Sequence, residues 1–99
     1  MYQAQYFDEV FFDIQEAKIW YKEQKEGLEI EFAIAVEIAV EKILKMPSIY
    51  PLRYKKVRIA RPKIFPYNIH FYIDEINKIV IFTAIVHNKR ISKFAQNRI

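Results

Sequence analysis

The sequence contains no cysteine and only one glycine among its 99 residues. Without cysteine the chain can form no disulfide scaffold, no thiolate zinc site and no iron–sulfur cluster, and it has no cysteine nucleophile. A single glycine excludes a Walker phosphate loop and a dinucleotide-binding turn, because both need several. The two histidines lie far apart in the sequence without patterned carboxylates beside them, so we expect no metal and no cofactor.

Long hydrophobic runs are also absent. No stretch of 18 apolar residues is present, and the first residues lack a basic region followed by an apolar one. These absences argue against a transmembrane helix and a secretory signal, so we expect no membrane partner and a cytoplasmic location. The hydrophobic fraction of 53% excludes disorder, and the length predicts one domain over residues 1–99.

Charge is divided unevenly along the chain. Residues 1–46 hold ten acids and five bases, whereas residues 47–99 hold two acids and eleven bases. The second part therefore carries a net charge of +9, although the whole chain carries only +4. Such asymmetry indicates an anionic partner for the basic part, either nucleic acid or an acidic protein segment. The alternative is that the basic part only keeps a small sheet soluble.

The hydrophobic pattern predicts two helices followed by strands. Apolar residues recur with a helical period over 9–25, behind an Asp8 N-cap, and again over 28–45, with Gly27 between and Pro47 after them. Alternating or continuous apolar segments then predict strands. The expected strands are 2–7, 52–59, 64–73 and 79–86, and a short basic helix or irregular tail is expected over 89–98.

This order, β-αα-βββ-(α), predicts an α+β domain. We expect the two-helix hairpin to pack on one face of a mainly antiparallel sheet of about four strands. The strand over 79–86 is apolar almost throughout, so we expect it to be covered on both faces.

A basic cluster marks the first strand after the helices. Its members, within eleven residues, are Arg53, Lys55, Lys56, Arg58, Arg61 and Lys63. Such a cluster can contact phosphates or stack on bases. The alternative is an edge strand that lysine and arginine protect from aggregation. That alternative explains the lysines better than it explains Arg58 and Arg61, whose planar guanidinium groups suit phosphate or carboxylate.

His87 ends the apolar strand and is followed by Lys89 and Arg90. A histidine there could transfer a proton while the two cations stabilise a phosphate. The alternative is a strand-end histidine bonded to the backbone, and on these residues alone we favour it. His70, in mid-strand, is interpreted as structural.

Both helices carry apolar residues opposite their expected core stripes. On the helical wheel these residues are Phe12, Ile19, Ile30, Ile34 and Ile38. A two-layer fold has no third layer to bury them, so we expect a protein partner or a second copy of the chain, in a homodimer, to cover them.

The sequence resembles the RelE/ParE superfamily of bacterial toxin–antitoxin toxins, particularly its ParE-like, plasmid-stabilisation branch. The residues that carry the resemblance, in order, are Asp13-Ile14, Ala17, Trp20-Tyr21, Gln24, Gly27-Leu28, Phe32, Pro47, Tyr50-Pro51, Val57-Arg58, Phe65-Pro66-Tyr67, Ile69, Tyr72, His87 and Arg90. Their order extends over most of the chain and agrees with the independently predicted element order.

The resemblance implies a toxin neutralised by a cognate antitoxin whose C-terminal segment wraps it. It also implies one of two targets: ParE-like members poison DNA gyrase, and RelE-like members cleave mRNA on the ribosome. For gyrase-directed binding, the residues expected at the target are Arg58, Arg61, Tyr67, His87 and Arg90. For an endoribonuclease, His87 would transfer the proton, because Phe94 stands where some members carry a tyrosine, and Lys56, Arg58 and Arg90 would hold the phosphate. We favour binding over catalysis; a third hypothesis is an inactive homologue that serves only as a protein-interaction domain.

The charge asymmetry leads to a first prediction. An acidic antitoxin should be steered towards the basic part of the chain, so its association rate should fall as salt rises. Stopped-flow mixing over a series of salt concentrations measures this rate. A rate independent of salt would contradict a charge-steered encounter.

Overall fold

Two long helices form where the sequence lacks glycine and proline. The computed structural model describes residues 1–90 and 92–99, with helices α1 (Asp8–Gln24) and α2 (Leu28–Lys45). Gly27 lies between them with φ +94°, a left-handed conformation that glycine adopts readily, and it begins α2. Both predicted helices are confirmed, but Asp8 is not the N-cap: it lies in the first turn of α1, and Phe7 occupies the cap without a side-chain hydrogen bond.

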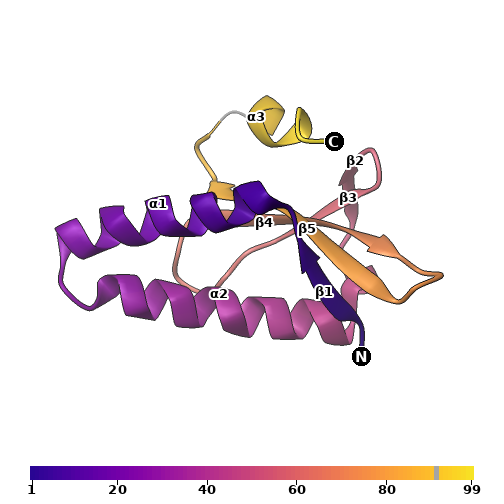
Figure 1. Ribbon diagram of the computed structural model, residues 1–99, viewed down its shortest axis with the longest axis horizontal. Coiled ribbons are helices and arrows are strands. Elements are labelled where there is room, and N and C mark those ends of the chain that lie inside the picture. Colours follow the sequence, from indigo (N-terminus) through magenta and orange to yellow (C-terminus); the bar gives the residue numbers. More distant parts are fainter. Residues whose placement is uncertain (91) are drawn as a thin grey trace.

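Five strands form one mixed sheet in the order β1-β5-β4-β3-β2 (Figure 1). The strands are β1 (Gln3–Tyr6), β2 (Leu52–Tyr54), β3 (Val57–Ala60), β4 (Tyr67–Asp74) and β5 (Ile79–His87). Only β1 and β5 pair in parallel; every other neighbouring pair is antiparallel. The predicted α+β class with a mainly antiparallel sheet is confirmed, with one strand more than expected.

The additional strand arises because the basic segment 52–59 is a hairpin and not one strand. The chain reverses at Lys55 and Lys56, and Lys55 takes a positive φ of 46°. Lys56 and Arg58 therefore do not lie on one strand. Lys56 lies in the turn, 4.1 Å above the ring of Tyr72, and Arg58 lies on β3.

The next strand begins three residues later than predicted, at Tyr67. Two prolines, Pro62 and Pro66, restrict the residues before them to extended backbone and lack a donor for a ladder. The chain turns between the prolines, and Ile64 has φ +76°. The segment 61–66 is therefore a loop between β3 and β4.

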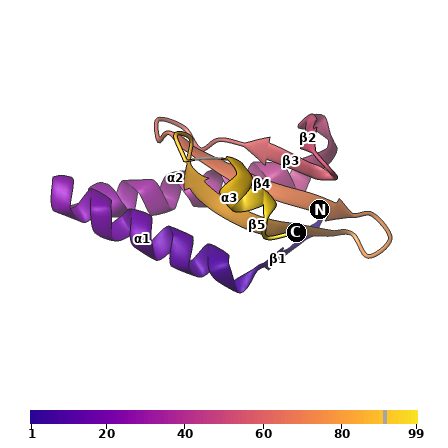
Figure 2. The same ribbon diagram turned by 90° about the horizontal axis from the view of Figure 1, so that it is seen from above.

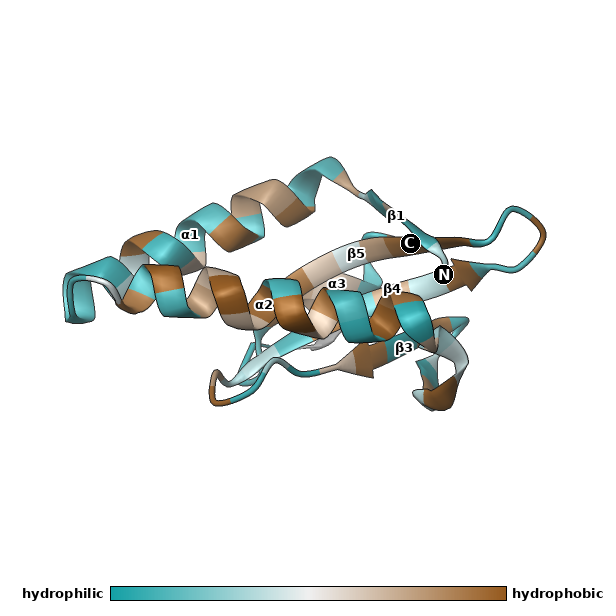
Figure 3. Ribbon diagram, turned by 90° about the horizontal axis from the view of Figure 1, so that it is seen from below, coloured by the Kyte–Doolittle hydropathy of each residue, from teal (hydrophilic) through white to brown (hydrophobic). Residues whose placement is uncertain are grey.

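The helices cover one face of the sheet, and a short third helix covers part of the other. Figures 2 and 3 show α1 and α2 side by side on one side, with α3 (Ser92–Gln96) over β4 and β5 on the other. The main core between sheet and helix hairpin is centred on buried aromatic residues such as Phe32, Phe71 and Phe82. On the opposite face Ala95 packs with Ala84 and Val86. Strand β5 is thus covered on both faces as expected, but α3 adds a third layer that the two-layer expectation omitted. Residue 91, within the expected tail, lies outside the described residues.

A bulge in β5 reverses which side chains face the helices. Phe82 pairs with Phe71 and Ala84 pairs with His70, so Thr83 is an extra residue in β5. Before the bulge, Phe82 faces the core; after it, Ile85 does, and His87 follows on the same face. In a regular strand of the same sequence, without the bulge, His87 would point to the α3 side.

An ion pair closes the outer edge of β5 where β1 ends. Past Phe82 no strand of the described residues borders this edge, and Asp13 of α1 accepts the Ile85 N–H at 3.0 Å. Arg98 donates twice to Asp13, at 2.6 and 2.8 Å, and once to the Thr83 carbonyl at 2.9 Å. The side chains of Asp13 and Arg98 are only 10% and 11% exposed. The pair therefore supplies the missing backbone partners and joins the C-terminal segment to α1.

No helix among the described residues is both long and apolar enough to cross a bilayer.

The ion pair leads to a stability prediction. Arg98→Gln should lower the free energy of unfolding by roughly 3 kcal/mol, because it leaves a buried carboxylate without its partner. Urea denaturation measures this loss. The control is Arg53→Gln, at an exposed arginine without an ion pair among the described residues, which should stay within about 0.5 kcal/mol of the parent. Equal stability of the two variants would show that the pair does not hold this edge.

Candidate functional site

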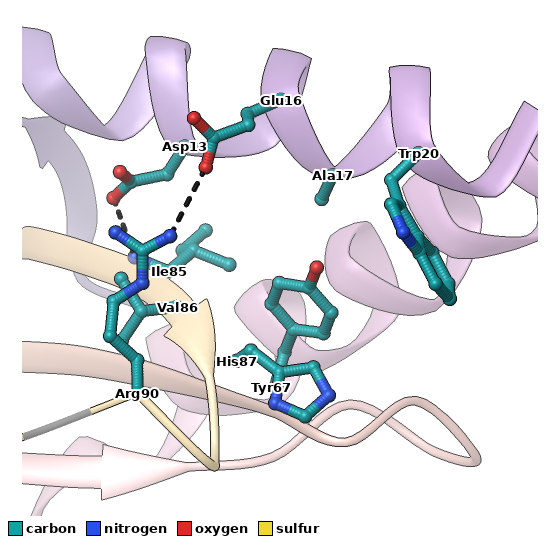
Figure 4. Close-up of a pocket in the computed structure, with 9 residues that line it drawn as sticks. All are labelled: Asp13, Glu16, Ala17, Trp20, Tyr67, Ile85, Val86, His87 and Arg90. Atoms are coloured by element: carbon teal, nitrogen blue, oxygen red, sulfur yellow. Dashed lines mark hydrogen bonds and ion pairs between the residues drawn. The ribbon is translucent and has the colours of Figure 1, made fainter.

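A cleft of about 460 Å³ lies between α1 and the end of β5. Its wall from α1 carries Asp13, Glu16, Ala17 and Trp20, and Tyr67, His87 and Arg90 face them (Figure 4). The volume is within the range of small-molecule or side-chain pockets. The cleft combines aromatic walls with charges of both signs, so it suits recognition of a polar surface group.

His87 reaches this cleft because of the bulge in β5. It pairs with Tyr67 on β4, and the two rings meet edge to face with centroids 5.3 Å apart. His87 Nδ1 accepts a hydrogen bond of 3.0 Å from the Lys89 N–H. In the neutral ring the proton therefore lies on Nε2, which is the atom left to donate to a bound group.

Arg90 lies at the mouth of the cleft between an acid and an aromatic ring. Its Nη2 is 3.4 Å from Glu16 Oε1, and its guanidinium carbon is 4.5 Å from the centre of the Phe94 ring. The Arg90 and Glu16 side chains are 43% and 77% exposed, so their ion pair is long, solvated and worth little. The Arg90 guanidinium is therefore accessible to a partner from solvent.

Tyr67 forms the floor and Trp20 one side of the cleft. Burial raises the pKa of Tyr67, so its hydroxyl stays protonated at neutral pH. In Figure 4 this hydroxyl points towards Ala17, whose small side chain leaves room above it. Trp20 is half exposed and presents a large apolar surface next to polar groups, a combination frequent in binding hot spots.

Three of the expected target residues meet in this cleft, and two do not. Tyr67, His87 and Arg90 line it. Arg58 instead pairs with Phe71, and Phe71 lies four residues, or about 13 Å, along β4 from Tyr67. Arg58 donates to the carbonyls of Ser48 and Tyr50.

Arg61 also lies elsewhere, with its Nε bonded to Asn68 Oδ1 at 3.0 Å. Lys56 stacks on Tyr72, which is on the sheet face opposite His87. The hypothesis that these cations surround His87 is therefore wrong for Lys56, Arg58 and Arg61.

The residues proposed for a protein interface are exposed. On α1 these are Phe12 and Ile19, and on α2 they are Ile30, Ile34 and Ile38, each at least half exposed. The helical wheel thus placed them correctly outside the core. What covers them stays a prediction.

Sequence reasoning missed the acidic side of the cleft. Glu16 was not considered, and Asp13 and Trp20 entered only through the family pattern. A signal was present, because Asp13, Glu16 and Trp20 share one helix face at spacings of three and four. That face points to the end of β5 and not to the central core.

The fold is similar to that of known toxins of toxin–antitoxin systems. A chain of the chromosomal ParDE system from P. aeruginosa superposes with a TM-score of 0.76 at 12% identity, covering 88% of this chain and 96% of that one. A chain of the RelBE2 toxin–antitoxin complex of Mycobacterium tuberculosis superposes with a TM-score of 0.62 at 19% identity, covering 87% of this chain and 96% of that one. The isolated E. coli RelE toxin superposes with a TM-score of 0.61 at 10% identity, covering 98% of this chain and 95% of that one. The chain therefore has the RelE/ParE fold. No family model and no curated protein matches its sequence.

His70 lies on the α3 face of the sheet and not in the cleft. It is 2% exposed, and its Nδ1 is 2.8 Å from the Tyr54 hydroxyl. Its pKa is lowered to about 4, mainly by burial and also by the nearby charges of Arg98 and Arg53, against the attraction of Asp13. This histidine is neutral in the folded protein at neutral pH, in agreement with a structural role.

His70 leads to a pH prediction. Below its ordinary pKa of 6.5 the unfolded chain binds a proton that the folded chain does not bind until about pH 4. Stability should therefore fall by up to about 3 kcal/mol as the pH drops through this window. His70→Gln removes the titrating group, and the difference in urea midpoint between parent and variant isolates the effect from the carboxylates. Parallel pH profiles for the two proteins would contradict this assignment.

Proposed function

We propose that the protein is the toxin of a bacterial type II toxin–antitoxin module, acts in the cytoplasm, binds and inhibits DNA gyrase, and is neutralised by an acidic antitoxin. The fold supports the toxin class, and the higher TM-score with the ParDE chain than with the two RelE chains supports the ParE-like branch. The target-binding site of this proposal is the cleft of Trp20, Tyr67, His87 and Arg90.

The observation that carries binding over catalysis is the separation of the basic residues from His87. Cleavage of RNA next to a 2′-hydroxyl needs a proton acceptor, a proton donor and positive charge at one phosphate. Lys56 lies about 16 Å along β4 from the His87 position, and on the other face. Arg58 is held by backbone carbonyls. Among the described cations, Arg90 is the one that lines the cleft beside His87.

The carboxylates of the cleft support the same conclusion. Glu16 lies within 3.4 Å of Arg90, so it would repel a phosphate bound there. Asp13 lines the same wall, although Arg98 balances its charge. A cleft with acids, a base and aromatic rings matches a protein surface better than an RNA backbone.

The antitoxin would cover the exposed apolar faces of the helices. Each isoleucine fully buried in such a complex contributes roughly 1.5–3 kcal/mol. Phe12, Ile19, Ile30, Ile34 and Ile38 are available for this contact. An inactive homologue would keep this interface and lose only toxicity.

A pair of substitutions separates binding from catalysis. His87→Ala should weaken but not abolish growth arrest and DNA-damage signalling on induced expression, because it removes one contact of the cleft and no proton transfer. Arg90→Ala should weaken target binding by about tenfold or more, since arginines are frequent hot-spot residues. Growth curves, a DNA-damage reporter and gyrase supercoiling assays measure these effects.

The control is Lys93→Ala, an exposed residue of the same C-terminal segment that lies outside the cleft. Ribosome-dependent mRNA cleavage by the parent protein, lost in His87→Ala, would replace the gyrase proposal with the endoribonuclease. Absence of any growth arrest would favour the inactive homologue.

A further inference from the structure

A second hollow, about 320 Å³ in volume, lies on the outer side of α2, away from the cleft. We call it the α2 groove. One wall is the outward face of α2, and the other is the loop between β3 and β4. Its apolar surface comes chiefly from Ile34 and Ile38 of α2 and Ile64 of the loop. Ile34 and Ile38 are 52% and 50% exposed, and Ile64 is 93% exposed.

Ile64 occupies an unfavourable backbone conformation. Its φ of +76° lies in the left-handed region, which a β-branched side chain rarely adopts. The sequence Arg61-Pro62-Lys63-Ile64-Phe65-Pro66 explains why: the residues before the prolines are held extended, so the reversal falls between them. Phe65 then enters the core, which leaves Ile64 pointing outward.

Within the described residues, burial contributes little to keeping an isoleucine at this position. The side chain is almost fully solvated, and asparagine or glycine would fit the backbone better. A strained residue that presents an apolar side chain to solvent beside two further exposed isoleucines indicates a contact made outside this chain.

Positive charge surrounds the α2 groove. Lys42, Arg61 and Lys63 line it, against the single acid Glu31. Among the described residues no carboxylate lies within ion-pair distance of these three cations. Arg61 is fixed through its Nε by Asn68, so its terminal nitrogens are held out for another acceptor. The groove therefore complements a ligand with apolar side chains and negative charge at their flanks.

We propose that the α2 groove binds an acidic amphipathic segment of a protein partner. Two apolar side chains about one helical turn apart enter between Ile64 and the Ile34–Ile38 pair, and flanking carboxylates bind Lys42, Arg61 and Lys63. If the proposed function holds, this segment belongs to the antitoxin. The groove is separate from the cleft, so one surface receives the partner and another contacts the target.

The experiment uses a matched pair of isoleucines. Ile64→Asn removes the apolar contact and suits the left-handed backbone, whereas Ile76→Asn changes an equally exposed isoleucine (93%) in the distant β4–β5 turn. The probe is a fluorescent helical peptide with two leucines four residues apart and glutamates beside them. A second peptide carries lysines in place of the glutamates.

We expect the glutamate peptide to bind the parent protein and Ile76→Asn equally, and Ile64→Asn at least tenfold more weakly by fluorescence anisotropy. Ile64→Asn should unfold at the same or a higher urea concentration than the parent, because it relieves strain. Ile34→Glu should also lose binding, and the lysine peptide should bind at least tenfold more weakly than the glutamate peptide. This combination of lost binding with retained stability distinguishes a docking surface from a residue needed for folding.

Three results would overturn the proposal. Equal binding by Ile64→Asn and Ile76→Asn would remove the groove as the site. Equal binding of the two peptides would remove the acidic partner. Sedimentation showing a dimer of the parent that Ile64→Asn dissociates would assign the groove to a second copy of this chain. Toxicity is measured without the peptide, so failure of the toxin proposal and failure of the α2 groove proposal are distinguished.

Discussion

The unpaired edge of β5 is the constraint on which the rest of the structure depends. Strand β1 borders β5 only as far as Phe82 and then becomes α1, which leaves the Thr83 carbonyl and the Ile85 N–H without a strand neighbour. Backbone groups left unpaired inside a protein destabilise it, and an open strand edge invites pairing with other chains. Asp13 and Arg98 satisfy both groups and each other. One side-chain pair thus fixes α1, β5 and the C-terminal segment together.

The bulge at Thr83 lies in the same short stretch and decides the chemistry of the cleft. Because the bulge breaks the alternation of β5, His87 lies on the helix side, opposite Tyr67, and small Ala84 and Val86 are left for α3 to cover. Residues 83–87 therefore determine both where the C-terminal helix packs and which groups face α1.

The helices could be predicted from the sequence because their apolar period is long and uninterrupted, and the same period placed Ile34 and Ile38 outside the core. The hairpin at Lys55 and Lys56 could not, since two lysines are no turn signature and the positive φ is imposed by the pairing of β2 with β3. The bulge was hidden because an apolar run covered on both faces shows no alternation that an extra residue could break. That hidden shift placed His87 on the sheet face opposite Lys56, and distance along β4 separates it from Arg58.

The parallel pairing of β1 with β5 has a consequence for the order in which the molecule assembles. Gln3 pairs with Ile79, so the first strand of the chain must wait for one of the last segments made. Contacts so distant in sequence form slowly, whereas the α1–α2 hairpin is local and can form early. On the ribosome, a nascent chain will expose its apolar helices well before the sheet and the cleft exist. The outer faces of those helices can therefore be reached by a waiting protein before the finished molecule is released.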